Sequence, residues 1–170
     1  WQDCYGCTYS SANEAMIEAE STLFERQITL YVGSDSIKTR WVQSVRYYLR
    51  QGKIGIRFSF ELLPYLSELR SHFTSYKLKE ISGLTSVYAV RLFEMLKQFG
   101  DINKSRYFVI NVNEFRNRLG LEDEYSRFGN LKAKVIGVAV NQIKENTEFK
   151  NLSYKQETEG RKVVRLAFFF

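Results

Sequence analysis

Histidine, cysteine and proline are scarce in this chain of 170 residues. It contains one histidine, His72, two cysteines, Cys4 and Cys7, and one proline. A zinc site needs four Cys, His or carboxylate ligands, and no second C-x-x-C pair completes such a set. A thioredoxin-like redox pair needs a preceding strand and a helix that starts at the first cysteine, and too few residues precede Cys4 to predict either. We therefore expect no metal and no other cofactor, and interpret Cys4 and Cys7 as thiols near a turn.

The same scarcity argues against one class of enzyme. A rolling-circle nuclease uses a His-x-His metal site with a catalytic tyrosine, and a chain with one histidine cannot supply it, despite its 11 tyrosines. Long apolar runs are also missing: no stretch approaches the roughly 18 residues of a membrane-spanning helix. No signal peptide opens the chain, which starts abruptly at Trp1. We expect a soluble, intracellular fragment with no membrane partner, whose leading segment is missing.

Positive charge is concentrated in the second half. Residues 1–75 contain 8 Lys/Arg and 8 Asp/Glu, whereas residues 76–170 contain 17 and 11. Within residues 127–170 the counts are 9 basic and 4 acidic. A basic surface is typical of a protein that binds a polyanion such as nucleic acid.

The first half is predicted to form a helix followed by strands. Ser11 and Glu14 match the S-x-x-E capping box, so a helix should start near Ala12 and end near Glu25. Its apolar face would consist of Ala12, Ala15, Met16, Ala19 and Leu23. Three strand-like runs follow, at 27–32, 38–49 and 53–60. They predict an antiparallel sheet of two or three strands, followed by a helix over 62–72 with Pro64 in its first turn.

The second half has a different order of elements. A helix should start after Thr85 or Ser86 and stop at Gly100, with an inward face of Val87, Val90, Leu92, Phe93 and Leu96. A short strand (107–110), a helix (112–119) closed by Gly120 and an acidic turn (122–124) follow, the turn read as a solvated loop. A long helix should run from Gly129 or Asn130 to about Asn146, with Leu131, Val135, Ala139 and Ile143 inward and Val138 beside them. Strands at 152–156 and 162–169, joined by a turn at 157–160, end the chain.

This order is that of a winged helix, in which two helices across a tight turn form a helix-turn-helix and a terminal hairpin forms the wing. The first half resembles the later part of a second such unit. We therefore predict an α+β protein with two winged-helix domains, the first (1–73) incomplete at its N-terminus and the second (74–170) the main DNA-binding domain.

The long helix of the second half is the predicted recognition helix. Its N-terminal residues should reach base edges in the major groove, where Lys can bond guanine, Asn can bond adenine and Ala can touch a thymine methyl group. The candidate residues on this helix and just before it are Arg127, Asn130, Lys132, Ala133, Lys134, Asn141 and Lys144. The alternative is an ordinary amphipathic surface helix, which the helix-turn-helix context disfavours.

Two further sets of cations are candidates for phosphate contacts. The predicted wing has Arg161 and Lys162 at its tip, beside Gly160, and Lys155 on a strand. Such contacts fix the register of a protein on DNA without reading sequence, although charges on edge strands also prevent aggregation. Arg91, on the first helix of this unit, either contacts phosphate or pairs with Glu94.

Several ordered motifs in 74–170 resemble the second winged helix of plasmid replication initiator (Rep) proteins. The segment 86–96, SVYAVRLFEML, is similar to the family pattern S-x-Y-A-x-R-L-Y-E-x-L. The entry to the recognition helix is matched by Tyr125-x-Arg127-Phe128-x-x-Leu131-Lys132-x-Lys134, and its end by Val140-Asn141-x-Ile143. The wing is matched by Gly160-Arg161-Lys162-Val163, and the closing strand by Phe168-x-Phe170. Residues 12–27, and Trp41 with the hairpin after it, match the first winged helix more loosely. Family members often have a run of arginines where this chain has Lys132, Ala133 and Lys134.

The resemblance implies a protein with no catalytic residues that initiates theta-type plasmid replication in the cytoplasm of a bacterial host. Its partners would be the repeated double-stranded DNA sequences (iterons) of the origin, a second copy of the chain bound through the first domain, and host replication proteins. Dimers of the family repress their own gene. Three alternatives stay open at this stage: a winged-helix transcriptional repressor without initiator activity, a nuclease or relaxase, and a protein–protein interaction module.

Overall fold

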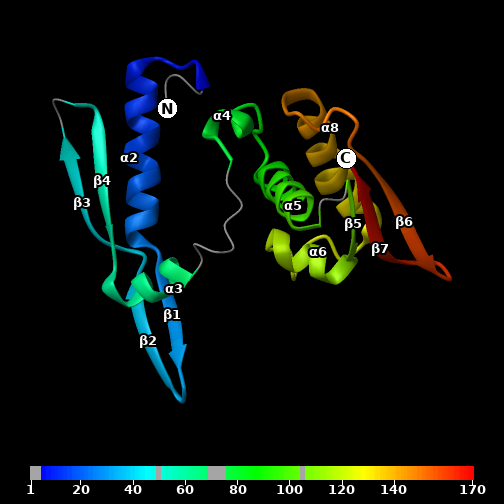
Figure 1. Cartoon of the computed structure of the whole chain (residues 1–170), viewed down its shortest axis with the longest axis horizontal. Helices are drawn as coiled ribbons and strands as arrows, with labels where there is room; N and C mark the ends of the chain where they lie inside the picture. The colour runs from blue at the N-terminus through cyan, green and yellow to red at the C-terminus, as the bar shows by residue number, and fades with distance from the viewer. Residues whose placement is uncertain (1–4, 49–50, 69–75, 104–105) are drawn as a thin grey trace. The chain divides into compact units, whose positions relative to one another are not determined.

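The computed structural model describes residues 5–48, 51–68, 76–103 and 106–170 (Figure 1). The chain divides into two compact units, Trp1–Phe73 and Thr74–Phe170, called unit 1 and unit 2 below. Within the described residues, no helix has the length and apolar character needed to cross a bilayer.

The long helix of unit 1 is α2 (Tyr9–Glu25), which starts three residues before the predicted Ala12. The side chain of Thr8 caps it by accepting a hydrogen bond from the backbone N–H of Ser11, so Ser11 lies inside the first turn. The predicted capping box of Ser11 with Glu14 is therefore wrong, because Thr8 has the same capping chemistry one turn earlier. Of the predicted apolar face only Ala12 is buried, and Ala19 is exposed.

Two separate hairpins follow, rather than one sheet (Figure 1). Strand β1 (Gln27–Val32) pairs with β2 (Asp35–Arg40), and β3 (Val42–Tyr48) pairs with β4 (Lys53–Phe58). The strand predicted over 38–49 is broken at Trp41, whose backbone N–H donates to the carbonyl of Arg26 and whose carbonyl accepts from Ser59. Each bond continues one ladder by a residue, since Arg26 precedes β1 and Ser59 follows β4, so the chain passes from the first hairpin to the second at Trp41.

The last part of unit 1 is helical. Strand β4 ends at Phe58 instead of the predicted Phe60, because buried Ser59 begins the short 3₁₀ helix η1 (Phe60–Leu62). The helix α3 (Leu63–Glu68) follows and has Pro64 in its first turn, as predicted. Residues 69–72 of the predicted helix lie outside the described residues.

Unit 2 has the predicted order of elements. After a single turn, α4 (Leu78–Ile81), it contains α5 (Val87–Asn103), β5 (Tyr107–Asn111), α6 (Val112–Leu119), α7 (Phe128–Leu131), η3 (Lys132–Ile136), α8 (Gly137–Asn146), β6 (Ser153–Glu159) and β7 (Lys162–Phe169). The three strands form one antiparallel sheet in the order β5-β7-β6. Strand β6 extends three residues beyond the predicted Gln156, which leaves a tight turn at Gly160.

The helices of unit 2 pack on one face of this sheet. Phe108 of β5 and Phe168 of β7 are opposite each other on the covered face, and the Phe168 ring centroid lies 5.7 Å from that of Phe115 in α6. Side chains alternate along a strand, so Val109 and Lys155, on either side of Ala167, lie on the open face and are exposed, while the small side chain of Ala167 between them is 6% exposed. The sheet therefore has one face in the core and one face in solvent.

Two details of α5 differ from the prediction. Val87, expected inside, is 56% exposed, while Ala89, Leu92, Phe93 and Leu96 are buried. Gly100 does not stop the helix, which continues to Asn103. A Cβ at Gly100 would lie 3.3 Å from the ring of Phe170, so this glycine permits a close approach inside the helix instead of ending it.

Candidate nucleic-acid interface

Helices α6 and α7–α8 form a helix-turn-helix. The side chain of Asn111 caps α6 by accepting from the backbone N–H of Asn113 at 2.8 Å. Gly120 ends α6 in the left-handed conformation (φ 67°), as predicted, with its N–H bonded to the carbonyls of Arg116 and Asn117. Both ends of α6 are therefore fixed by local hydrogen bonds, which sets where the turn begins.

The side chain of Arg116, which is only 9% exposed, stabilises the turn from its buried side. Its guanidinium donates from Nη1 to the carbonyl of Glu124 (2.6 Å) and from Nη2 to those of Tyr125 and Ser126. Tyr125 has a positive φ of 50°, which is uncommon for a residue other than glycine. Arg116 thus fixes the backbone immediately before α7, and with it the direction in which α7 starts.

Sequence reasoning missed Arg116. A signal was present, because Arg116 lies on the same helical stripe as Val112, Phe115 and Leu119, all of which are buried. A single arginine among apolar inward positions indicates a buried cation that needs acceptors, and the carbonyls of the adjacent turn are the nearest ones.

The predicted core ladder of the recognition helix is confirmed. Leu131, Val135, Ala139 and Ile143 are each 0–1% exposed. The position of Val138 was predicted wrongly: it is 39% exposed, and Ile136 and Val140 are buried in its place. The reason is η3, a π-helical turn that interrupts the helix, in which the N–H of Gly137 bonds to the carbonyl of Lys132, five residues back.

Every predicted contact residue on this helix is exposed. Arg127 is the residue before α7, Asn130 lies in α7, and the rest follow along η3 and α8: Lys132, Ala133, Lys134, Asn141 and Lys144. The four cations of this set make no ion pair within the part of the chain that the structure describes. They are Arg127, Lys132, Lys134 and Lys144. Several other cations of unit 2 are neutralised, since Lys97 contacts Glu80 and Glu148, and Arg118 contacts Glu114.

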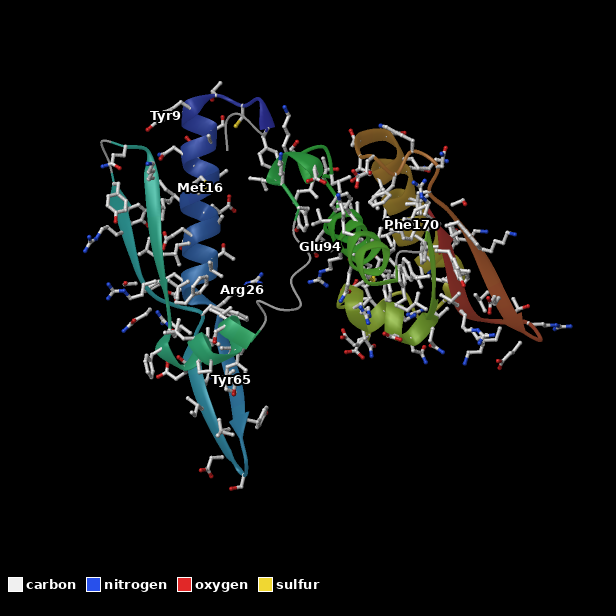
Figure 2. The ribbon with its side chains drawn as sticks, in the orientation of Figure 1. Tyr9, Met16, Arg26, Tyr65, Glu94 and Phe170 are labelled. Carbon is white, nitrogen blue, oxygen red and sulfur yellow. The ribbon has the colours of Figure 1, made fainter. Side chains whose placement is uncertain are left out.

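The wing divides the remaining candidates into two groups. Arg161 and Lys162 are exposed at the tip of the β6–β7 hairpin, beside Gly160 (φ 59°), where nitrogen-tipped side chains stand out (Figure 2). Lys155 lies instead on the open face of the sheet, with its Nζ 5.6 Å from the ring centroid of Phe169. Because the helices cover the other face, Lys155 is not brought together with the recognition-helix residues.

Arg91 is exposed on α5, and no ion pair joins it to Glu94 within the described residues. Glu94, labelled in Figure 2, instead accepts a hydrogen bond from the Tyr76 hydroxyl. The guanidinium of Arg91 lies over Gly120, so that a Cβ there would be 2.8 Å from Nη1. Arg91 is therefore placed beside the helix-turn-helix and is free of the alternative pairing.

The structure offers no metal site of its own within the described residues: they contain no group of three or more His, Cys, Asp or Glu that could hold an ion. Glu122, Asp123 and Glu124 are exposed side chains in the turn, and the Glu124 backbone carbonyl serves as an acceptor for Arg116. Cys4 and His72 lie outside the described residues.

Comparison with known proteins agrees with this architecture. The family model "Initiator Replication protein, WH1" matches residues 2–97, and "Initiator Rep protein, WH2" matches residues 111–170. The crystal structure of the Pi initiator protein in complex with iteron DNA is similar in fold, with a TM-score of 0.80 and 24% sequence identity over 98% of this chain and 76% of that one. The protein is thus an α+β protein with two winged-helix domains, and the chain belongs to the family of plasmid replication initiator (Rep) proteins.

Proposed function

We propose that this initiator binds the repeated sequences of a plasmid origin as double-stranded DNA, chiefly through unit 2. The observation that carries the proposal is the set of exposed cations and amides on α7, η3 and α8, whose cations make no ion pair within the described residues. A helix-turn-helix whose turn is fixed by Arg116 holds them. The Pi initiator is crystallised with iteron DNA, and its likeness in fold supports the same class of partner.

In this proposal the start of the recognition helix reads bases. Lys132 and Lys134 offer ammonium donors to guanine O6 and N7, and the amide of Asn130 fits the N6 and N7 atoms of adenine. Ala133 presents a methyl group for contact with thymine. These side chains come from the N-terminal turns of the helix, which enter the major groove in helix-turn-helix proteins.

The cations at the wing tip position the protein. Arg161 and Lys162 would contact phosphate or the minor groove, and Arg91 would contact phosphate beside the turn. Lys155 faces the other way across the sheet and is the weakest member of the proposed set. Asn141 and Lys144, farther along α8, would meet the edge of the groove or its backbone.

A salt titration tests the nucleic-acid proposal directly. Fluorescence anisotropy with a labelled duplex of the origin repeats, and with a scrambled duplex, would be repeated from low to high salt. Binding should weaken with a slope of about −0.9 in log K against log[salt] per phosphate neutralised. An affinity that salt does not change would contradict the proposal and favour a protein–protein module.

Unit 1 is proposed to mediate self-association, with a secondary DNA contact. Its described surface exposes large apolar side chains on both hairpins, among them Tyr31, Ile37 and Ile56. Unit 2 has its own core, so residues 76–170 should be monomeric in sedimentation and still bind DNA weakly, whereas the whole chain should dimerise. A stable dimer of 76–170 would reverse the roles of the two units.

Initiation, rather than repression alone, needs a second test. The same surface can read an operator, so a repressor without initiator activity would pass the titration. Permanganate footprinting of a supercoiled origin should reveal unpaired thymines when the protein is bound, and host replication proteins should join that complex in the cytoplasm of the bacterial host. We expect no nicking with Mg²⁺ or Mn²⁺, because opening would come from binding energy; a nicked product would indicate a nuclease.

A further inference from the structure

The π-helical turn η3 changes which residues share a face of the recognition helix. In a regular α-helix each residue advances about 100°, so the three steps of four from Leu131 to Ile143 would drift by about 120°. A π-turn inserts one residue and removes about 100° of that rotation, which leaves Leu131 and Ile143 within about 20° of each other. Their nearly complete burial at both ends of the ladder fits the second geometry.

Val138 is the residue most affected. Seven positions after Leu131, it would lie about 20° from Leu131 in a regular helix, on the buried face. The inserted residue turns it outward, into a row with Asn130 and Lys134, and all three are exposed. Gly137 maintains the turn through its hydrogen bond to Lys132, with only 3.2 Å available between a Cβ there and the Lys132 carbonyl oxygen.

We propose that Val138 is a specificity-determining residue that contacts the 5-methyl group of a thymine in the bound site. This rests on the proposed function. The row places one apolar side chain after an amide and an ammonium donor on the helix that would enter the major groove. The thymine methyl is the apolar feature that the major groove displays. Val138 therefore reads a base position next to the ones read by Asn130 and Lys134, one turn further along the helix.

The test compares thymine with uracil, which lacks only the methyl group. The whole chain first selects duplexes from a library with a randomised 20-base-pair segment. Each thymine of the selected duplex is then replaced singly by deoxyuracil, and affinities are measured for the unaltered protein, Val138→Ala and Val138→Thr. One replacement should weaken binding of the unaltered protein about three- to five-fold, the effect of re-exposing one methyl group.

Val138→Ala should show about the same loss on the thymine duplex and no further loss at that uracil, whereas Val138→Thr, which keeps one methyl, should retain part of the discrimination. Val109→Ala is the matched control, since Val109 is a similarly exposed valine on the open face of the sheet, and its uracil profile should equal that of the unaltered protein. Alanine is the better helix former, so melting curves should show that Val138→Ala folds.

Two results would overturn the proposal while leaving the proposed function intact: a uracil profile of Val138→Ala identical to that of the unaltered protein, or no uracil sensitivity at any position. A library that yields no preferred sequence would overturn the proposed function itself, and this inference with it.

Discussion

The side chain of Gln142 in α8 caps the start of α5 through Thr85, 57 positions earlier in the sequence. Its Oε1 accepts from the backbone N–H groups of Thr85 and Ser86, both at 3.0 Å, and its Nε2 donates to Thr85 Oγ1 at 2.9 Å. The exposed N–H groups at a helix start need acceptors. One amide therefore supplies the cap of α5 and joins that helix to the recognition helix.

Loss of this cap should destabilise unit 2. Gln142→Ala removes both hydrogen-bond acceptance and donation, and we expect a loss of about 0.5–2 kcal/mol in the free energy of unfolding, the usual range for a missing helix cap. Gln142→Glu keeps the acceptor and places a negative charge at a helix N-terminus, which is favourable, so it should lose less. Urea unfolding followed by circular dichroism measures both; equal losses for the two variants would indicate that the cap contributes little.

Arg116 should affect DNA binding although its side chain is buried beneath the turn. Arg116→Met keeps the apolar stem but leaves the carbonyls of Glu124, Tyr125 and Ser126 without their donor. We expect a destabilisation of about 2–3 kcal/mol, within the range for buried polar groups that lose a charged partner, and a weaker preference for origin repeats over scrambled DNA.

Arg116→Lys provides the comparison, because it keeps the charge but can reach fewer carbonyls. Stability should fall between the other two proteins, and so should the preference for origin repeats. If Arg116→Met lost stability but kept the full preference, Arg116 would be a structural residue only.

The order of elements in unit 2 was predictable because its signals are local. The inward ladder Leu131, Val135, Ala139 and Ile143 is visible as apolar residues spaced by four, which the π-turn η3 keeps on one face. Gly120 marks the end of α6 at a position that needs a positive φ. The exposure of the contact residues on this helix follows from the same periodicity, as they lie off the ladder.

The predictions were wrong where backbone contacts between residues distant in the sequence, or small changes of helix geometry, determine the local structure. No residue type marks a π-turn, so the outward rotation of Val138 had no sequence signal. The passage from one hairpin to the next at Trp41 involves Arg26 on one side and Ser59 on the other, and the close contact of Gly100 depends on Phe170. At α2, Thr8 and Ser11 are both competent caps, and sequence alone does not choose between them.

The ion pairs of Lys97 should make the stability of unit 2 depend on pH. Its Nζ lies 2.7 Å from Glu80 of α4 and 2.6 Å from Glu148, which follows α8. The hydrogen bond from Lys97, helped by the backbone N–H of Lys77, lowers the pKa of Glu80 below its ordinary 4.5. Burial opposes the charge of Lys97, but the two carboxylates outweigh it and raise its pKa above 10.5.

A lowered carboxyl pKa stabilises the folded state above the unfolded value and ceases to do so as the pH falls through the folded value. The stability difference between the unaltered protein and Glu80→Gln should therefore be complete near pH 6 and should shrink as the pH falls below about 4.5. The raised pKa of Lys97 sets the alkaline limit: the stability that its ion pairs contribute is lost as the pH rises above 10.5.

Urea unfolding from pH 3 to 7 measures the acidic limit. Glu114→Gln, which breaks the exposed pair with Arg118 within α6, is the control and should change stability by no more than about 0.5 kcal/mol. A difference for Glu80→Gln that is constant over this range would mean that the ionised carboxylate is not what stabilises α4 against α5.

Lys132 and Arg161 should have different roles in DNA binding: Lys132 should contact a base, and Arg161 should contact phosphate. Lys132 lies near the start of the recognition helix and Arg161 at the wing tip, and both are exposed and unpaired within the described residues. If Lys132 contacts a base, Lys132→Ala should cost about 1–3 kcal/mol on the origin repeat and much less on scrambled DNA. Arg161→Ala should weaken both duplexes by similar factors and reduce the salt slope by about one.

The measurement is a competition titration of each variant against the two duplexes, with Lys79→Ala, an exposed lysine on α4, as the control for loss of one positive charge. Neither Lys132 nor Arg161 supports the core, so melting temperatures should be nearly unchanged. Equal losses on both duplexes for Lys132→Ala would make it a phosphate contact. If Lys132→Ala, Lys134→Ala, Arg161→Ala and Lys162→Ala all bound like Lys79→Ala, the DNA-binding face would lie elsewhere in the chain. These four residues are most of the recognition-helix and wing cations that have no ion pair among the described residues.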